Sequence, residues 1–181
     1  MITRTTKSGK EVTLRPPIWG DVQIYLQYIN TLSREDTFIT FSGEQQTYSQ
    51  EEKYVKECID KISKGDMVKL MCFVDGQLAG VCDAVRDVHN RTRQRHCATI
   101  GLTVTQEYRG LGLGEILLKE CIRESKEKLH RVSILHLDVY SPNLVAQKLY
   151  KKVGFVEHSR LPKGVSYKGT YHDLIGMHLQ I

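Results

Sequence analysis

The sequence of 181 residues lacks any apolar run that approaches the length of a membrane-spanning helix. No apolar core follows the charged residues of its first segment, 1–7, so we expect neither a membrane span nor a secretory signal peptide. It also lacks internal repeats, low-complexity tracts and convincing linkers. With 40% hydrophobic and 26% charged residues, the chain can bury a substantial core without disulfides or metals, and we expect a single domain over residues 1–181.

The cysteines form no Cys-x-x-Cys pair, are odd in number and are scattered through apolar contexts. They are Cys58, Cys72, Cys82, Cys97 and Cys121. This usage is typical of buried, reduced thiols in a cytoplasmic protein, and it argues against a disulfide framework or a metal site. The net charge of +5 suits an anionic ligand. It is too small and too dispersed to indicate nucleic-acid binding by itself.

Hydrophobic spacing and turn residues predict an antiparallel meander followed by a β-α-β-α-β order, which is a mixed sheet of the α+β class. We expect strands at 11–15, 67–74, 77–88, 98–104, 132–140, 155–158 and 174–181, with a type I′ turn at Asp75-Gly76. We expect helices capped by Asp21, by a capping box at 49–52 and by Ser141-Pro142, and a further helix over 115–129. The segment 33–47 is expected to be an irregular loop or a broken helix.

A glycine-rich segment joins the expected strand 98–104 to the helix 115–129. Its glycines, Gly110, Gly112 and Gly114, occupy alternate positions just after Arg109. Exposed amides at a helix N-terminus form an anion site, because the first N–H groups lack intrahelical partners and the helix dipole is positive there. Arg109 adds a fixed charge and a fork of donors that fits a phosphate. The alternative is a flexible turn with no ligand.

Spacing excludes two familiar phosphate loops. A P-loop requires Gly-Lys-Ser/Thr at its end, whereas Gly114 is followed by Glu115 and Ile116. A dinucleotide fingerprint requires a glycine three residues after Gly112, where this chain has Glu115.

A second pattern covers residues 143–155, Asn-Leu-Val-Ala-Gln-Lys-Leu-Tyr-Lys-Lys-Val-Gly-Phe. Ala146, Leu149 and Tyr150 fall on one helical face, so this segment alone is also consistent with an ordinary amphipathic helix whose tyrosine packs in the core. Taken with the loop, however, it resembles the Gcn5-related N-acetyltransferase (GNAT) superfamily. The loop matches the pattern Arg/Gln-x-x-Gly-x-Gly/Ala, and residues 143–155 match Asn-x-x-Ala-x-x-Leu-Tyr-x-x-x-Gly-Phe.

The resemblance implies a GNAT-type fold, a mostly antiparallel sheet of six to seven strands with a splayed parallel pair and helices on both faces. It implies acetyl-coenzyme A (acetyl-CoA) as co-substrate and transfer of its acetyl group to an amine. The pyrophosphate would be bound by the amides of Arg109, Gly110, Leu111, Gly112, Leu113 and Gly114. The pantetheine arm would lie along the strand that contains Leu102, Thr103 and Val104, with Asn143 on the far side, and Tyr150 would protonate the departing thiolate.

The acceptor of the amine's proton stays open at this point. A phenol with a pKa of about 10 is a feasible proton donor to a thiolate whose thiol has a pKa of about 8.5, but an attacking ammonium must also lose a proton. Several family members place a glutamate on the strand before the glycine loop, whereas residues 98–102 supply no carboxylate. Glu35, His96 and a chain of water molecules are the three candidates.

The amine acceptor is also open between a protein N-terminus, a polyamine and a small-molecule amine. The basic segment with His89, Arg91, Arg93, Arg95 and His96 could attract an acidic peptide or the 3′-phosphate of acetyl-CoA, or it could be a solvated connection. A non-catalytic acyl-CoA sensor on the same fold is the alternative function. A basic nucleic-acid-binding protein is a third reading, for which no motif is found. We expect a monomer or homodimer with no nucleic-acid or membrane partner and no metal.

Overall fold

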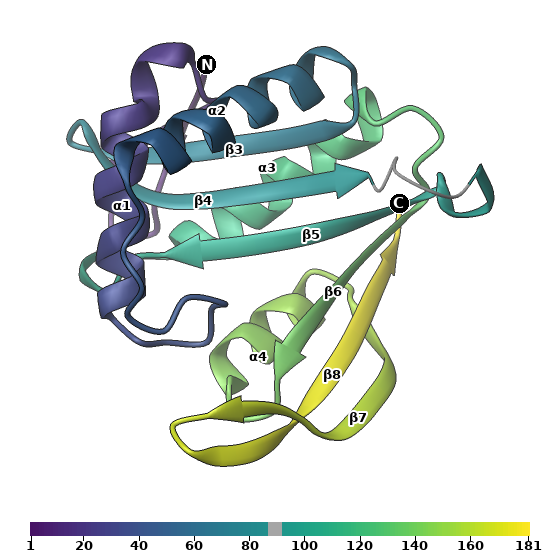
Figure 1. Cartoon of the computed structure of the whole chain (residues 1–181). Coiled ribbons are helices and arrows are strands. Elements are labelled where there is room, and N and C mark those ends of the chain that lie inside the picture. Colours follow the sequence, from purple (N-terminus) through teal and green to yellow (C-terminus); the bar gives the residue numbers. More distant parts are fainter. Residues whose placement is uncertain (87–91) are drawn as a thin grey trace.

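The computed structural model describes residues 1–86 and 92–181, which form one eight-stranded mixed sheet with helices on both faces (Figure 1). The strand order is β1-β2-β3-β4-β5-β6-β8-β7. The strands are β1 (Ile2–Thr5), β2 (Glu11–Arg15), β3 (Met67–Val74), β4 (Gln77–Arg86), β5 (Cys97–Val104), β6 (Ile134–Tyr140), β7 (Val156–Tyr167) and β8 (Thr170–Gln180). The sequence prediction of the fold class is confirmed. The strand count differs from the expected six to seven, because β1 adds an edge strand that pairs antiparallel with β2.

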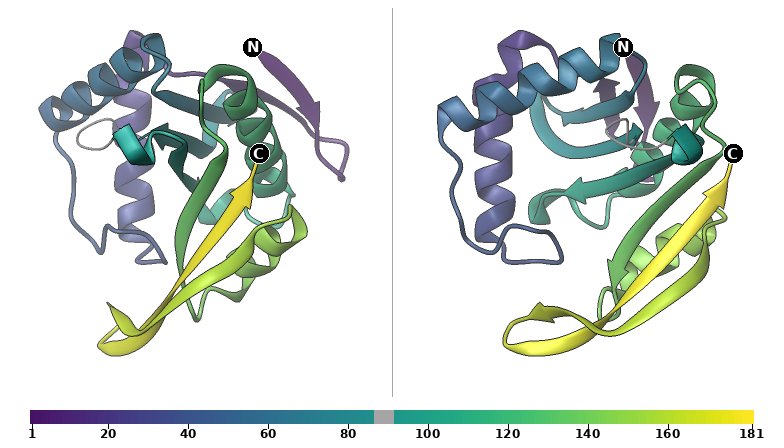
Figure 2. Two further views of the ribbon diagram at one scale, coloured as in Figure 1. Left: turned by 90° about the vertical axis from the view of Figure 1, so that its right-hand side faces the viewer. Right: turned by 45° about the vertical axis from the view of Figure 1, so that its right-hand side comes forward.

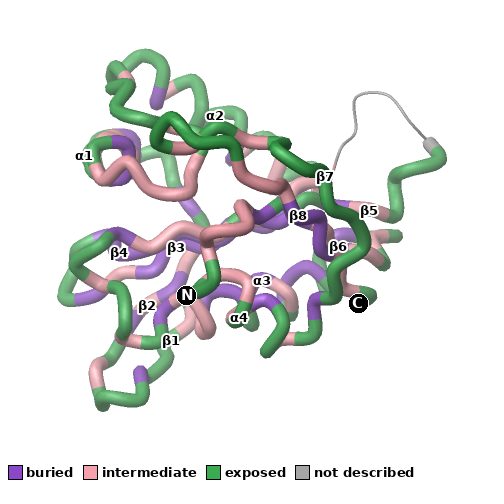
Figure 3. Tube along the Cα trace, turned by 90° about the horizontal axis from the view of Figure 1, so that it is seen from below, coloured by how far each residue is buried: buried purple, intermediate pink, exposed green. Residues whose placement is uncertain are grey.

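Two helices cover each face of the sheet (Figure 2). On one face lie α1 (Val22–Arg34) and α2 (Tyr48–Ser63), whose apolar residues pack on Met71, Leu78 and Val81. On the other lie α3 (Leu113–Lys128) and α4 (Leu144–Lys152). We call these the α1/α2 face and the α3/α4 face. Most residues of the central strands β3 and β4 are buried, and successive residues face opposite sides of the sheet. Figure 3 colours the chain by this burial.

The neighbours β5 and β6 are the parallel pair of this sheet, and they pair over only three positions, from Cys97↔Ile134 to Thr99↔His136. Beyond Thr99 the strands diverge, as Figure 1 shows. β5 keeps its pairing with β4 as far as Val104, and β6 keeps its pairing with β8 as far as Tyr140. Within the described part of the chain, the edge of β5 that faces β6 therefore has no strand partner over residues 100–104. We call this opening the β5/β6 gap.

Two helix N-caps differ from the sequence prediction. α2 is capped by Thr47 rather than Ser49, because the Thr47 amide donates to Gln50 Oε1 (2.8 Å) and the Gln50 amide donates to Thr47 Oγ1 (3.4 Å). α4 is capped by Asn143, whose Oδ1 accepts from the Ala146 amide (3.2 Å), so the prediction of Ser141-Pro142 as the cap was wrong. The expected turn at Asp75-Gly76 is confirmed, with both residues at positive φ.

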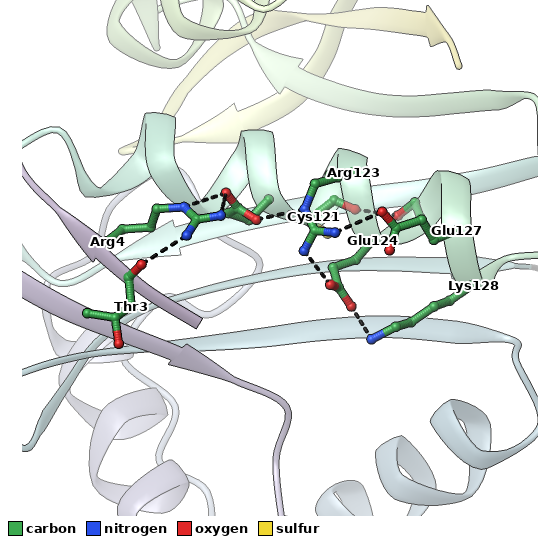
Figure 4. Close-up of polar contacts among 9 residues, drawn as sticks. Thr3, Arg4, Cys121, Arg123, Glu124, Glu127 and Lys128 are labelled. Carbon is green, nitrogen blue, oxygen red and sulfur yellow. Dashed lines mark hydrogen bonds and ion pairs between the residues drawn. The ribbon is translucent and has the colours of Figure 1, made fainter. Parts of the chain in front are cut away.

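Ion pairs along the exposed side of α3 attach it to β1. Arg4 on β1 donates to Glu120 Oε1 (2.7 Å), and Arg123 on α3 contacts Glu120, Glu124 and Glu127 (Figure 4). Because Arg4 and Arg123 remain exposed to solvent, these pairs fix geometry more than they add stability.

The five cysteines are free, and four of them are buried. No helix within residues 1–86 and 92–181 is long and apolar enough to cross a membrane. The predicted strand end at 87–88 and the residues His89 and Arg91 lie outside the described residues.

Candidate active site

The glycine loop follows β5 and ends as the N-terminus of α3. A single 3₁₀ turn (Gln106–Tyr108) leads into it, and Gly110 and Gly112 have φ of 81° and 82°. These left-handed conformations favour glycine. α3 begins at Leu113, two residues earlier than predicted, with Gly112 as its N-cap residue. The unpaired first N–H groups of the helix therefore belong to the glycine loop itself, where an anion can be bound.

Space around the loop distinguishes its glycines. A Cβ at Gly110 or Gly112 would meet no atom within 4 Å, so both lie against open space. A Cβ at Gly114 would lie 3.3 Å from Leu149 Cδ2 and 3.5 Å from Leu102 Cδ2. Gly114 thus lets α3, α4 and β5 approach one another, which brings α4 next to the loop.

The free edge of β5 presents backbone groups to the β5/β6 gap. The His96 carbonyl accepts from the amides of Ser133 (2.9 Å) and Ile134 (3.1 Å), so it points toward β6. Because strand residues alternate, the amides and carbonyls of Ile100, Leu102 and Val104 point the same way. A linear pantetheine arm of amide groups fits this edge. The sequence interpretation named Leu102 and Val104 for this role, which stays a prediction, and Ile100 shares their orientation.

Thr103 differs from its neighbours, since this alternation directs its backbone toward β4. Its side chain lies on the α1/α2 face, where the hydroxyls of Thr103 and Tyr28 are 2.8 Å apart. The Thr103 side chain therefore connects β5 to α1. Contact of Thr103 with acetyl-CoA stays a prediction.

The Arg109 side chain is engaged within the protein. Its Nε donates to the Val104 carbonyl (2.9 Å), and its guanidinium pairs with the Glu35 carboxylate. The other Glu35 oxygen accepts from the Gln106 amide (2.8 Å). Both oxygens of this candidate base are therefore occupied, and only 9% of its side chain is exposed. The structure joins Glu35 to the glycine loop.

Tyr150 lies on α4, is 7% exposed, and packs with its ring centroid 5.7 Å from that of Phe155. Burial raises the pKa of the Tyr150 phenol, and the nearby Cys82 thiol adds to this effect. A raised pKa keeps the phenol protonated over the physiological range, as a proton donor requires. Asn143 caps α4 through its Oδ1, which leaves its amide N–H groups to donate elsewhere.

The structure does not bring His96 together with the other candidates. His96 is exposed and precedes β5, whereas the glycine loop follows the other end of that strand. Eight residues at about 3.3 Å each separate His96 from Val104 by about 26 Å. Arg95, from the predicted basic segment, is at this same end and lines a pocket of about 430 Å³ with Asp66, Arg86, His130 and Arg131. This location disfavours contact between Arg95 and a phosphate at the glycine loop.

Aromatic residues meet on the α1/α2 face beside the β5/β6 gap. Phe38, in the loop after α1, lies 4.7 Å from Tyr167 and 6.2 Å from Tyr140 between ring centroids. The Tyr167 hydroxyl donates to the Asp36 carbonyl (3.1 Å). The loop after α1 and the β7–β8 hairpin thus touch, and Phe38, Tyr140 and Tyr167 form an aromatic wall on the α1/α2 side of the gap.

A row of residues on this same face was not predicted from the sequence. β3 pairs Lys69 with Asp83 of β4, and β4 pairs Asp83 with Gly101 of β5. The Lys69 ammonium donates to Asp83 Oδ2 (2.6 Å) and to the Tyr54 hydroxyl (2.8 Å). The sequence signal for this row was a lone lysine inside apolar β3 and a lone aspartate inside apolar β4.

The model of the acetyltransferase (GNAT) family matches residues 27–155. The chain is 31% identical over 105 residues to the L-amino acid N-acetyltransferase AaaT of Escherichia coli (strain K12), an alignment that covers 58% of this chain. The chain spans only 63% of the length of that relative.

Two solved structures illustrate the shared fold. The acetyltransferase of the GNAT family from Streptococcus pneumoniae superposes with a TM-score of 0.84 at 26% identity, over 94% of this chain and 99% of that one. A GNAT superfamily phosphinothricin acetyltransferase from Sinorhizobium meliloti, in complex with acetyl-CoA, has a TM-score of 0.78 at 17% identity, over 94% and 88% of the two chains. The fold and the family model together define the class: this chain belongs to the acetyltransferase (GNAT) family.

Proposed function

We propose that this protein is an N-acetyltransferase that transfers the acetyl group of acetyl-CoA to a primary amine. One observation carries the proposal: the free backbone edge of β5 continues directly into the glycine loop and the N-terminus of α3. The edge fits the amide-rich pantetheine arm, and the helix N-terminus fits the pyrophosphate. The relative named as an L-amino acid N-acetyltransferase supports the reaction class.

Residues on the α3/α4 face would bind acetyl-CoA. The amides from Arg109 to Gly114 would bind the pyrophosphate, and the open space at Gly110 and Gly112 fits a closely approaching phosphate. Leu102 and the Val104 amide would pair with the pantetheine arm, together with the Asn143 side-chain amide, while the Val104 carbonyl accepts from Arg109. The complex of the phosphinothricin acetyltransferase with acetyl-CoA supports this ligand for the fold.

Tyr150 would act as proton donor to the leaving sulfur. It lies on the α3/α4 face in a buried setting that keeps the phenol protonated. When the amine attacks the thioester carbonyl, a strand amide of the β5 edge would stabilise the oxyanion. Collapse of the tetrahedral intermediate breaks the C–S bond, and the phenol would protonate the thiolate.

The acceptor would enter from the α1/α2 face, between the aromatic wall and β5. The candidates are free amino acids, peptide N-termini and polyamines, and the relative places L-amino acids first. Reduced thiols are typical of cytoplasmic proteins, so we place the protein there.

The test measures free thiol released from acetyl-CoA with each class of amine, alongside the affinity for acetyl-CoA by calorimetry. Thiol release that depends on one class of amine supports the proposal and names the acceptor. Binding of acetyl-CoA without thiol release for any amine would instead identify the alternative, a non-catalytic acyl-CoA sensor. No binding of acetyl-CoA would contradict both.

A further inference from the structure

Residue Asp83 lies on the α1/α2 face, one strand away from the β5/β6 gap. Its Oδ1 is 3.3 Å from the position that a Cβ would occupy on Gly101, its partner on β5. A larger residue at 101 would stand between this carboxylate and the gap. Glycine at 101 leaves the path between the Asp83 carboxylate and the gap open, and 24% of the Asp83 side chain is exposed to solvent.

Lys69 holds the carboxylate in this position. The Lys69 side chain is 1% exposed, and its ammonium lies 5.1 Å and 5.0 Å from the ring centroids of Tyr25 and Tyr54. Burial alone would lower the pKa of Lys69, but Tyr25, Asp83 and Tyr54 together raise it well above the ordinary value. Lys69 is therefore a fixed cation that orients Asp83 Oδ2, while Oδ1 lies above Gly101.

Strand alternation places Asp83 and its neighbour Cys82 on opposite faces. Cys82 belongs to the core of the α3/α4 face and is the thiol whose proximity affects Tyr150. Tyr150, the proposed proton donor, therefore lies near Cys82 on one face of the sheet, and Asp83, the next residue of β4, lies on the other face. The β5/β6 gap connects these two faces.

We propose that Asp83 accepts the proton of the attacking amine and that Lys69 positions it. This inference rests on the proposed acetyl transfer. The ammonium gives one proton to the Asp83 carboxylate, directly or through one water, and the neutral nitrogen forms the C–N bond with the thioester carbon. As the C–S bond breaks, the sulfur takes the Tyr150 proton. The second nitrogen proton leaves to solvent, from which Tyr150 is protonated again. The Asp83 carboxyl then releases its proton to solvent, so one turnover releases one net proton.

Other titratable groups lie around this pair. They are Tyr25 on α1 and Glu51, Tyr54 and Cys58 on α2, all close to Lys69. Across the gap, Asp138 on β6 occupies the same face as Asp83, because it lies two residues after His136, the partner of Thr99. Asp138 is the competing carboxylate, and the experiment includes it.

The experiment compares kcat and its pH dependence for the wild type, Asp83→Asn and Asp138→Asn, with the acceptor found for the wild type. We expect Asp83→Asn to lower kcat about 10²-fold at pH 7.5, with the affinity for acetyl-CoA within threefold of wild type. Its activity should rise with pH as the free amine forms. Asp66→Asn is the matched control. Asp66 is buried to a similar extent as Asp83 and pairs with Arg86 of β4, but this pair lies away from the gap.

Two further variants separate chemistry from folding. Asp83→Asn with Lys69→Met removes both charges, so it avoids an unpaired buried lysine, and it should show the same loss. The double variant Asp83→Ala, Gly101→Asp again has a carboxylate beside the gap. Its kcat should be at least tenfold higher than that of Asp83→Asn.

An Asp83→Asn enzyme within threefold of wild type, with an unchanged pH profile, would overturn the role of Asp83 alone. The same conclusion follows if Asp138→Asn shows the loss and the pH shift while Asp83→Asn does not. A wild type that releases no thiol with any amine would overturn the proposed function, and the role of Asp83 with it.

Discussion

Glu35 and Arg109 form an ion pair that connects the end of α1 to the glycine loop. The two residues are 74 positions apart, and the pair is reinforced because Glu35 also accepts from the Gln106 amide (2.8 Å). The arginine that the loop motif offers to a phosphate is thus held by a carboxylate from the opposite face of the sheet. This arrangement links Arg109 to α1, and both oxygens of Glu35 accept hydrogen bonds from the loop.

Replacement of the arginine should therefore affect stability more than affinity. In Arg109→Ala, the largely buried Glu35 carboxylate loses its cation, and we expect the free energy of unfolding to fall by about 1–3 kcal/mol. The Kd for acetyl-CoA should change less than fivefold, because the backbone amides remain. Denaturant unfolding and calorimetry measure the two effects. A Kd raised more than 50-fold at unchanged stability would show that the guanidinium contacts the phosphates.

Glu35→Gln tests the same carboxylate as a base. Because both oxygens of Glu35 are already bonded, we expect kcat within threefold of wild type and the same pH profile. Steady-state kinetics between pH 6 and 9 measure this. A large loss of kcat that recovers at high pH would return the proton-acceptor role to Glu35 and count against Asp83.

Gly112→Ala tests the loop as the site of acetyl-CoA binding. The residue has φ of 82° and faces open space, so a methyl group there would meet an incoming phosphate and would also strain the backbone. The expected result is at least a tenfold increase in Kd.

Gly9→Ala is the matched control for Gly112→Ala. Gly9 has φ of 83° with no atom within 4 Å of the added carbon, and it lies in the turn between β1 and β2. Both variants should lose about 1–2 kcal/mol of stability from the left-handed conformation, and only Gly112→Ala should lose affinity. Equal affinities in the two folded variants would remove Gly112 from the binding site.

Tyr150→Phe removes one hydroxyl and keeps the packing against Phe155. If Tyr150 donates the proton to sulfur, kcat should fall by roughly 10²–10⁴, with little change in melting temperature or in the Kd for acetyl-CoA. A fall below threefold, with chemistry established as rate-limiting, would mean that the thiolate leaves unprotonated or through water. The tyrosine would then be a core residue of α4.

Glu51 should make stability depend on pH. Its side chain is buried, Oε1 has no hydrogen-bond partner within the described part of the chain, and burial raises the pKa of its carboxyl to about 7. Between the unfolded pKa near 4.5 and 7, the folded protein holds a proton that the unfolded chain releases. Protonation of Glu51 therefore contributes fully to the free energy of unfolding below pH 4.5, and this contribution is lost as the pH rises through 7.

Glu51→Gln keeps the shape and removes the charge, so it should raise the melting temperature by a few degrees at pH 8 and by much less at pH 5. Glu57→Gln, at an exposed position of the same helix, is the control and should shift neither value. Differential scanning calorimetry at the two pH values gives the result. An equal effect of Glu51→Gln at both would contradict the raised pKa.

Local signals in the sequence predicted much of this molecule. The Asp75-Gly76 hairpin, the glycine loop and the helix that carries Tyr150 each depend on residues within a few positions of one another, so spacing and turn chemistry are enough. The family-typical order of two motifs then predicted the splayed parallel pair, which the short β5–β6 pairing confirms. Cap positions were less certain, because Thr47 and Ser49, or Ser141 and Asn143, compete within one turn.

The chemistry of the acceptor side was decided by tertiary structure. Strand register places Lys69, Asp83 and Gly101 in one row across three strands, and no periodicity within a single segment specifies that register. The pairing of Glu35 with Arg109 likewise depends on how α1 lies against the end of β5. Sequence by itself determined where a phosphate can meet bare amides, since that property belongs to a short loop. Which carboxylates lie beside the β5/β6 gap follows from long-range packing, since it depends on distances between strands that only the folded sheet sets.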